Sequence, residues 1–193
     1  AADKKVAAAF DLARAARKAN DNERARIILD GLPPGAIAES HPAEMWSEIS
    51  IAARQALLDG NAQNAYRLVS RAGIPPEVAA PYADSQFMAG WIALRFLKAP
   101  QTALKHFRNI TDRAGRPISL ARGFYWQGRA QEAAGDVAGA WAAYDAAAQH
   151  RETFYGMLAL ARIEENPTMQ VRETPARMPA RETFDTDELV RAM

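Results

Sequence analysis

The sequence contains no cysteine, no long uninterrupted apolar run and no excess of charge of either sign. Without cysteine the chain forms no disulfide and no thiolate metal site. Charged residues interrupt the apolar runs every few positions, so no segment is long enough to span a bilayer. The 24 basic and 23 acidic side chains leave a formal net charge of +1. Binding of nucleic acid or of an anionic membrane through overall charge is therefore excluded.

The sequence also lacks the alternating segments rich in Val, Ile and Thr that are typical of strands. Apolar residues recur instead every three or four positions, and Ala, Leu, Arg, Gln and Glu, which favour helix, are abundant. We therefore predict an all-α fold. Helices are expected at residues 3–19, 21–30, 43–59, 61–72, 82–97, 100–110, 117–134, 136–149 and 152–163.

Polar and special residues mark the expected helix ends. Asn20-Asp21, Asn61 and Asp136 can accept hydrogen bonds from the first free amides of the helices that follow. First-turn positions are predicted for Pro42, Pro100 and Pro117, because a proline there loses no helical hydrogen bond. Left-handed backbone after a helix is predicted for Gly60, Gly73 and Gly135.

Small and large side chains recur with a period near 40 residues. Ala25, Ala65, Ala103 and Ala140 stand 40, 38 and 37 residues apart. Each follows a turn position by five residues (Asn20, Gly60, Lys98, Gly135) and precedes a large apolar residue by four (Leu29, Val69, Phe107, Tyr144). A small residue lets two antiparallel helices approach closely, and a large one fills the gap to the next hairpin. Residues 1–163 are therefore predicted to form an α-superhelix (solenoid) of antiparallel helical hairpins with a period of about 37–40 residues.

The segments after this repeat domain differ from it. Residues 164–184 contain three prolines and no sustained periodicity, which predicts a linker. Residues 185–193 resemble the opening of a helix, with Thr186 as its cap and acidic residues in its first turn. We expect this helix to belong to a further domain that lies outside the chain.

No pattern in the sequence predicts catalysis, a metal site or a cofactor. Glu39-Ser40 lies in a loop without an apolar wall and is interpreted as a helix-capping pair. The acidic pairs Glu44 with Glu48 and Glu132 with Asp136 are interpreted as solvated faces. The histidines, at positions 41, 106 and 150, lack the spacing of metal ligands.

Aromatic residues are interpreted mainly as packing. Trp46, Trp91, Trp126 and Trp141 all fall within expected helices and are predicted to fill hairpin interfaces, with sugar stacking on one of them as the alternative. Basic residues lie beside aromatics, as in Lys105-His106-Phe107-Arg108, but the aromatics stand at core-facing repeat positions and the net charge is near zero. We therefore predict no nucleic-acid partner.

Four stretches together resemble a known family. They are "NAYRLVSRAGI" (64–74), "YADSQFMAGWIALRFLKAPQTALKHF" (82–107), "PISLARGFYWQGRAQEAAGD" (117–136) and "TFYGMLALARI" (153–163). In this order they are similar to the α-superhelical region of soluble lytic murein transglycosylases, which precedes a lysozyme-like catalytic domain. The resemblance covers residues 64–163, about half of the chain.

The resemblance implies a periplasmic role in peptidoglycan turnover. The family cleaves the β-1,4 bond between N-acetylmuramic acid and N-acetylglucosamine without water and leaves a 1,6-anhydro end. Its catalytic glutamate lies in the carboxy-terminal domain, in a Glu-Ser motif followed by a Gly-Leu-Met-Gln segment. This chain has no Gly-Leu-Met-Gln, and its Glu39-Ser40 precedes the superhelix-like stretches. No catalytic residue can therefore be transferred to it.

The expected function is that of a scaffold region, inactive by itself, whose partners are glycan strands and the carboxy-terminal catalytic domain of the same protein. The alternative is a helical-repeat scaffold for protein–protein interaction. Arg95, Arg122 and Arg129 are the polar residues of the family-like stretches that we select as candidate glycan contacts. Their competing interpretation is hydrogen bonding between helices inside the repeat.

Overall fold

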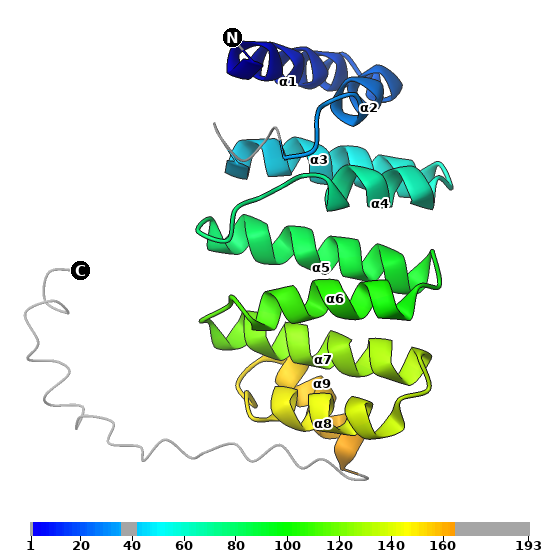
Figure 1. Ribbon diagram of the computed structural model, residues 1–193, viewed down its shortest axis with the longest axis vertical. Helices are drawn as coiled ribbons and strands as arrows, with labels where there is room; N and C mark the ends of the chain where they lie inside the picture. The colour runs from blue at the N-terminus through cyan, green and yellow to red at the C-terminus, as the bar shows by residue number, and fades with distance from the viewer. Residues whose placement is uncertain (1, 36–41, 165–193) are drawn as a thin grey trace, which may run out of the picture.

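The computed structural model describes residues 2–35 and 42–164, and every regular element in these ranges is a helix (Figure 1). The all-α prediction is confirmed. The helices are α1 (Ala2–Lys18), α2 (Asn22–Asp30), α3 (Pro42–Leu58), α4 (Ala62–Ser70), α5 (Ala79–Arg95), α6 (Pro100–Thr111), α7 (Pro117–Ala133), α8 (Val137–Ala148) and α9 (Phe154–Ile163). None of these helices has the length and hydropathy that a membrane span requires.

Consecutive helices pack against one another and follow one another down the long axis of the molecule, from α1 at the top of Figure 1 to α8 and α9 at the bottom. The pairs α1–α2, α3–α4, α5–α6 and α7–α8 are joined by short turns. Odd-numbered helices also contact the next odd-numbered helix, from α3 through α5 and α7 to α9. One side of the stack therefore presents α3, α5, α7 and α9 in succession.

The turns inside the four pairs share one backbone conformation. The residues at the predicted turn positions all have positive φ: Asn20 (64°), Lys98 (53°), Gly60 (77°) and Gly135 (79°). Glycine adopts this left-handed region freely and asparagine tolerates it, whereas lysine is strained there. The 40-, 38- and 37-residue spacing found in the sequence is thus repeated in the backbone.

The predicted caps form as expected. Asp21, Asn61 and Asp136 accept hydrogen bonds from the amides of Arg24, Asn64 and Gly139, which would otherwise be unpaired at the helix starts. Pro42, Pro100 and Pro117 are each the first residue of their helix. The sequence missed one cap, Thr153, whose hydroxyl accepts from the Gly156 amide at the start of α9.

Helix α5 begins three residues earlier than predicted. Pro81 lies in its first turn, where the amide that a proline lacks has no helical acceptor anyway, so the helix can begin at Ala79. The remaining predicted boundaries agree with the structure to within two residues.

In the third and fourth helical pairs an aromatic side chain packs over a glycine. A Cβ added to Gly90 would lie only 2.6 Å from the ring of Phe107, and a Cβ added to Gly128 would lie 2.5 Å from the ring of Tyr144. Gly90 and Gly128 lie five residues before the last residue of α5 and α7, and at the corresponding place in α1 and α3 stand the fully buried Ala13 and Ala53. Glycine therefore stands opposite an aromatic ring in the third and fourth pairs, whereas the first two pairs have alanine at this position.

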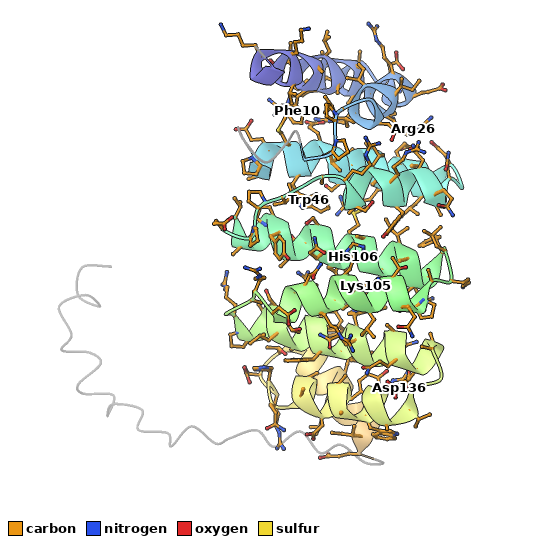
Figure 2. The ribbon with its side chains drawn as sticks, in the orientation of Figure 1. Phe10, Arg26, Trp46, Lys105, His106 and Asp136 are labelled. Atoms are coloured by element: carbon orange, nitrogen blue, oxygen red, sulfur yellow. The ribbon has the colours of Figure 1, made fainter. Side chains whose placement is uncertain are left out.

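In the first two pairs, the residue after the repeat alanine forms a hydrogen bond to the next pair. Arg26 Nη1 donates to Asn64 Oδ1 at 3.2 Å, and Tyr66 Oη lies 3.0 Å from His106 Nε2; Arg26 and His106 are labelled in Figure 2. Trp141 occupies this position in α8 and is 50% exposed. The prediction that Trp141 fills a hairpin interface is therefore wrong, because no second helix of a following pair covers it within the described residues.

The interpretation of Glu48 as part of a solvated face is also wrong. Glu48 is only 6% exposed, and Arg17 of α1 donates to both of its oxygens, at 2.5 and 2.8 Å. Hydrogen bonding from Arg17 holds the pKa of Glu48 below its usual value, against the opposing effect of burial. This ion pair joins the first helical pair to the second. Glu44, Glu132 and Asp136 are exposed, as predicted.

Several sequence predictions fall outside the described residues. These are the Glu39-Ser40 capping pair, His41, the linker beyond residue 164 and the helix start at 185–193.

Candidate functional site

A groove of about 770 Å³ opens on the side of the stack that carries the odd-numbered helices. Its walls are α3, α5 with the residue that follows it, and the start of α7. The lining residues are Trp46, Arg54, Leu57 and Leu58 from α3, Asp84, Phe87, Met88, Trp91 and Phe96 from α5 and its end, and Arg122 from α7. The groove thus crosses three successive layers of the stack.

The floor of the groove is aromatic and aliphatic. Trp91 and Phe96 pack edge to face, with ring centroids 5.2 Å apart and an interplanar angle of 69°. Phe96 is 45% exposed, and Leu58 on the opposite wall is 80% exposed. Large apolar side chains held open to solvent in a concave surface are typical of a binding site.

One end of the groove carries an ordered polar group. Arg122 Nη2 donates to Asp84 Oδ1 at 2.9 Å, which links α7 to α5. The guanidinium of Arg122 also stacks on Phe87, with Cζ 4.7 Å from the ring centroid. The two contacts fix the position of Arg122 by charge and by a cation–π interaction.

The second arginine of the groove has no acidic partner within salt-bridge distance among the described residues. Arg54 Nη1 donates to Ser50 Oγ one turn earlier at 3.1 Å, and the side chain is exposed. Arg54 and Trp91 occupy the same repeat position, one residue after Ala53 and Gly90 respectively. Because α3 contacts α5, an unpaired cation and an indole ring face the groove from adjacent layers.

A second cleft of about 280 Å³ continues the groove along the stack. It shares Asp84 and Arg122 with the first and extends past Arg116 and Ser119 to Tyr155 of α9. Together the two clefts run across α3, α5, α7 and α9. A surface of this length suits an extended ligand better than a compact one.

The structure places only one of the three selected arginines in the groove. Arg122 lines it and also makes a hydrogen bond between helices, so both interpretations of this residue apply. Arg95 is exposed at the end of α5 and does not line the groove. Arg129 pairs along its own helix with Glu132, at 3.1 Å. Glu132 also accepts from Arg162 of α9 at 2.7 Å.

The histidine of the repeat core is structural. His106 Nδ1 lies 2.9 Å from Gln86 Oε1, an acceptor, so Nδ1 carries the proton and Nε2 accepts from the Tyr66 hydroxyl. Burial lowers the pKa of His106. In the part of the chain that the structure describes, no group of three or more His, Asp and Glu side chains could hold a metal ion.

Most of the groove was missed by the sequence analysis, although signals for it exist. Leu57 and Leu58 are adjacent at the end of α3, and two neighbouring leucines cannot both face the same partner helix. Likewise Gly90 and Gly128 stand 38 residues apart, and Gly90 is followed by Trp91, which lines the groove. Aligning these glycines with Ala13 and Ala53 would have shown that Arg54 and Trp91 stand at one repeat position.

Comparison of the chain with protein-family models, with curated proteins and with solved structures finds no match. Function must therefore be argued from the residues and the geometry. The family-like stretches hold packing residues of the fold, since Gly90 lies under Phe107, Gly128 lies under Tyr144, and Thr153 caps α9.

Proposed function

We propose that the chain is a binding scaffold, an α-solenoid of helical hairpins that holds an extended glycan strand in the groove across α3, α5, α7 and α9. Following the sequence resemblance, it would be the superhelical region of a periplasmic lytic transglycosylase that acts on peptidoglycan. Cleavage would then come from a separate catalytic domain of the same protein.

The observation that carries this proposal is the continuity of the groove. Two clefts that share Asp84 and Arg122 form one path along successive layers. Stacked helical repeats commonly use such a surface to bind long ligands. The recurrence of positive-φ turns at 37- to 40-residue intervals, and of glycines under aromatic rings 38 residues apart, supports the solenoid.

The chemistry of the lining favours a carbohydrate. A pyranose ring presents apolar C–H faces and a rim of hydroxyls, and Trp91 with Phe96 offers ring surface beside the polar atoms of Arg54, Asp84 and Arg122. A glycan strand repeats this combination along its length. The alternative use of tryptophan for sugar stacking, left open in the sequence, thus falls on Trp91.

The groove itself does not offer a catalytic acid. Asp84 is the carboxylate among its lining residues, and it accepts a hydrogen bond from Arg122. Proton transfer to a glycosidic oxygen needs a carboxyl group free to donate. The 193-residue chain should therefore release no 1,6-anhydro product from peptidoglycan, and detection of that product would contradict the scaffold assignment.

Binding is tested by cosedimentation of the protein with insoluble peptidoglycan sacculi. The wild type should pellet with the sacculi. Trp91→Ala should weaken the affinity for sacculi about tenfold, because a stacked ring contributes on the order of 1–2 kcal/mol to binding. Trp141→Ala is the matched control, since it removes an exposed tryptophan outside the groove. Equal loss in both variants, or no binding by the wild type, would reject the proposal.

A second candidate is a protein-interaction scaffold that binds an amphipathic helix. The observation in its favour is the exposed Leu58 beside Leu57 and Met88, because aliphatic side chains suit a helix better than a sugar. Leu58→Ser separates the two. The substitution should leave glycan binding within about twofold, whereas a hydrophobic helix would lose a main anchor.

A further inference from the structure

We propose that one face of α8 binds an amphipathic helix of a partner protein, in which a basic residue stands beside an apolar one. The α8 face consists of Val137, Trp141 and Asp145, which follow one another four residues apart and therefore lie on the same side of the helix. In Figure 1, α8 lies at the bottom of the stack, below α7. Residues of α8 line neither the groove nor the second cleft, so this surface is independent of the proposed glycan site.

The apolar character of α8 indicates that this face is a contact surface. Asp145 is the one charged residue of Val137–Ala148. Val137 is 64% exposed, and Trp141 is 50% exposed and is followed by an exposed alanine. A helix that is apolar on all sides is typically buried on all sides, and large apolar side chains open to solvent mark interaction sites. We therefore expect another protein surface to cover the α8 face.

The even-numbered helices show how such a face is covered inside the chain. Asp30 of α2 stands five residues after the repeat alanine Ala25, and Arg67 of α4 donates to both of its oxygens, at 2.8 and 2.5 Å. Asn64 of α4 also donates to Asp30, at 3.3 Å. Helix α6 carries Lys105, labelled in Figure 2, at the position that Arg67 has in α4. A basic residue therefore recurs at this position in the helices that follow α2 in the series.

Asp145 occupies in α8 the position that Asp30 has in α2, five residues after the repeat alanine. Its side chain is exposed, and among the described residues no basic group lies within salt-bridge distance of its carboxylate. A carboxylate without a partner thus stands where α2 has one that is held by a guanidinium. The α8 face has the acceptor of this contact without its donor.

Trp141 is the second feature that links the α8 face to the repeat. It stands one residue after the repeat alanine, a position from which α2 and α4 each form a hydrogen bond to the next even-numbered helix. The two bonds join Arg26 to Asn64 and Tyr66 to His106. The position therefore faces the next helix of the series, and in α8 it carries a half-exposed indole ring.

These two features define the chemistry of the partner. An arginine can bind Asp145 through two parallel hydrogen bonds, as Arg67 binds Asp30, and a neighbouring apolar side chain can cover Trp141. A helix presents such side chains on one face, whereas an acidic helix would meet Asp145 with like charge. The internal contact and the charge of the α8 face thus both favour a basic amphipathic helix.

The test uses the full chain and two synthetic alanine-based peptides of about 18 residues, long enough to form a helix in water. The basic peptide has a central arginine followed by a leucine, with further leucines one turn before and after, and the acidic peptide has glutamate in place of the arginine. The indole N–H signals in a ¹⁵N–¹H NMR spectrum report binding. The basic peptide should shift the Trp141 signal in a saturable manner and leave the Trp91 signal unchanged. The acidic peptide should bind about tenfold more weakly.

Asp145→Lys is the decisive variant, because it reverses the charge of the α8 face and leaves the apolar residues in place. It should bind the acidic peptide more tightly than the basic one. Asp11→Lys is the matched control, since it reverses an exposed aspartate of α1 outside the face, and it should keep the wild-type preference. Trp141→Ala should weaken the binding of the basic peptide about tenfold, because an aromatic anchor is lost.

Three results would overturn the proposal. Equal binding of the two peptides by the wild type would remove the role of Asp145. A shift of the Trp91 signal in place of the Trp141 signal would assign helix binding to the groove. Absence of any shift at Trp141 would reject the α8 face as a site for a partner helix. Protection of the Trp141 signal from a soluble paramagnetic agent would then assign the cover to the chain itself, or to a second copy where protection grows with protein concentration.

Discussion

The two halves of the molecule hold their layers together in different ways. Between the first two helical pairs, ion pairs accompany an apolar core: Arg17 of α1 donates to both oxygens of Glu48 on α3, and Arg67 of α4 donates to both oxygens of Asp30 on α2. Between α5 and α9 the core is largely aromatic. The rings of Phe87, Phe107, Trp126 and Tyr125 pack in succession with centroids 5.9–6.4 Å apart, and Tyr144 and Tyr155 both pack against Tyr125.

This difference accompanies a change of residue types in the repeat. Phe107 and Tyr144 pack over glycines, whereas Leu29 and Val69 share one hydrophobic cluster with alanines at the corresponding helix position, Ala13 and Ala53. Aromatic rings dominate the second case, whereas in the first an aliphatic core is supplemented by charge. One backbone plan is thus stabilised by two kinds of interaction.

The largest effect is expected where the aromatic contact is removed. Phe107 is fully buried, so Phe107→Ala should lower the free energy of unfolding by about 3–5 kcal/mol, through lost apolar burial and the cavity left against Gly90. Val69→Ala at the equivalent position deletes fewer atoms and should lower it by less than half as much. Urea unfolding monitored by circular dichroism measures both. Equal losses would remove the distinction between the halves.

The ionic half is tested with Glu48→Gln. Loss of the charge leaves Arg17 without its carboxylate and should lower the free energy of unfolding by about 1–3 kcal/mol. The pKa of Glu48 is lower in the folded state than in the unfolded chain, where it is near 4.3. The stabilisation by the Glu48 charge is therefore fully present above about pH 4.3 and is lost as pH falls through the lowered pKa of the folded state. Acid titration of unfolding should therefore differ between wild type and variant. Parallel pH profiles would contradict the role of the charge.

The size match in the aromatic half is tested by converting it to the other pattern. Gly90→Ala alone places a Cβ against the Phe107 ring and should lower the free energy of unfolding by about 1–2 kcal/mol, despite the better helix propensity of alanine. Adding Phe107→Leu gives this pair the residue types that the first hairpin has at the corresponding positions, Leu29 and Ala13. The double variant should therefore be more stable than the sum of the two single changes implies.

The control for this cycle is Gly115→Ala, since a Cβ at Gly115 meets no atom within 4 Å. Its effect should stay within about 0.5 kcal/mol. If the changes in the free energy of unfolding caused by Gly90→Ala and Phe107→Leu simply add, the residue size tolerated at one position does not depend on the residue at the other.

The smallest effect is expected at the junction between the two halves. His106 joins α6 to Tyr66 of α4, and its pKa is lowered by burial. Above about pH 6.5, the pKa of histidine in the unfolded chain, His106 is neutral in both states and its contribution to stability is fully present. As pH falls below this value, the unfolded chain takes up the proton first. The contribution is therefore lost as pH falls through the lowered pKa of the folded state. Unfolding measured between pH 7.5 and about 5 should show this slope in the wild type. His106→Gln should not show it.

The sequence predicted the elements and their repetition because these depend on local chemistry. Caps, first-turn prolines and turn residues act within a few positions of themselves, so Asp21, Pro100 and Gly135 could be interpreted one at a time. Glu48 could not, because its burial depends on Arg17 in another helix. Trp141 was misjudged for the same reason, since its exposure depends on which layer follows α8.

The groove was hidden in the sequence for a related reason. Its residues come from three helices, and only the stacking of α3, α5 and α7 brings Leu58, Trp91 and Arg122 to one surface. Arg122 was selected as a candidate glycan contact because it lies in a family-like stretch. Arg54 lies outside those stretches and was therefore not selected. The repeat position that it shares with Trp91 links it to the site.

The most direct test of the glycan-binding account uses the indole N–H signals of the four tryptophans in a ¹⁵N–¹H NMR spectrum. Trp46 and Trp91 line the groove, whereas Trp141 is exposed elsewhere. Addition of a soluble tetrasaccharide of the peptidoglycan glycan strand should shift the signals of Trp91 and Trp46 in a saturable manner and leave that of Trp141 unchanged. Shifts confined to Trp141, or no saturable shift at any indole, would contradict the assignment of the groove as the glycan site.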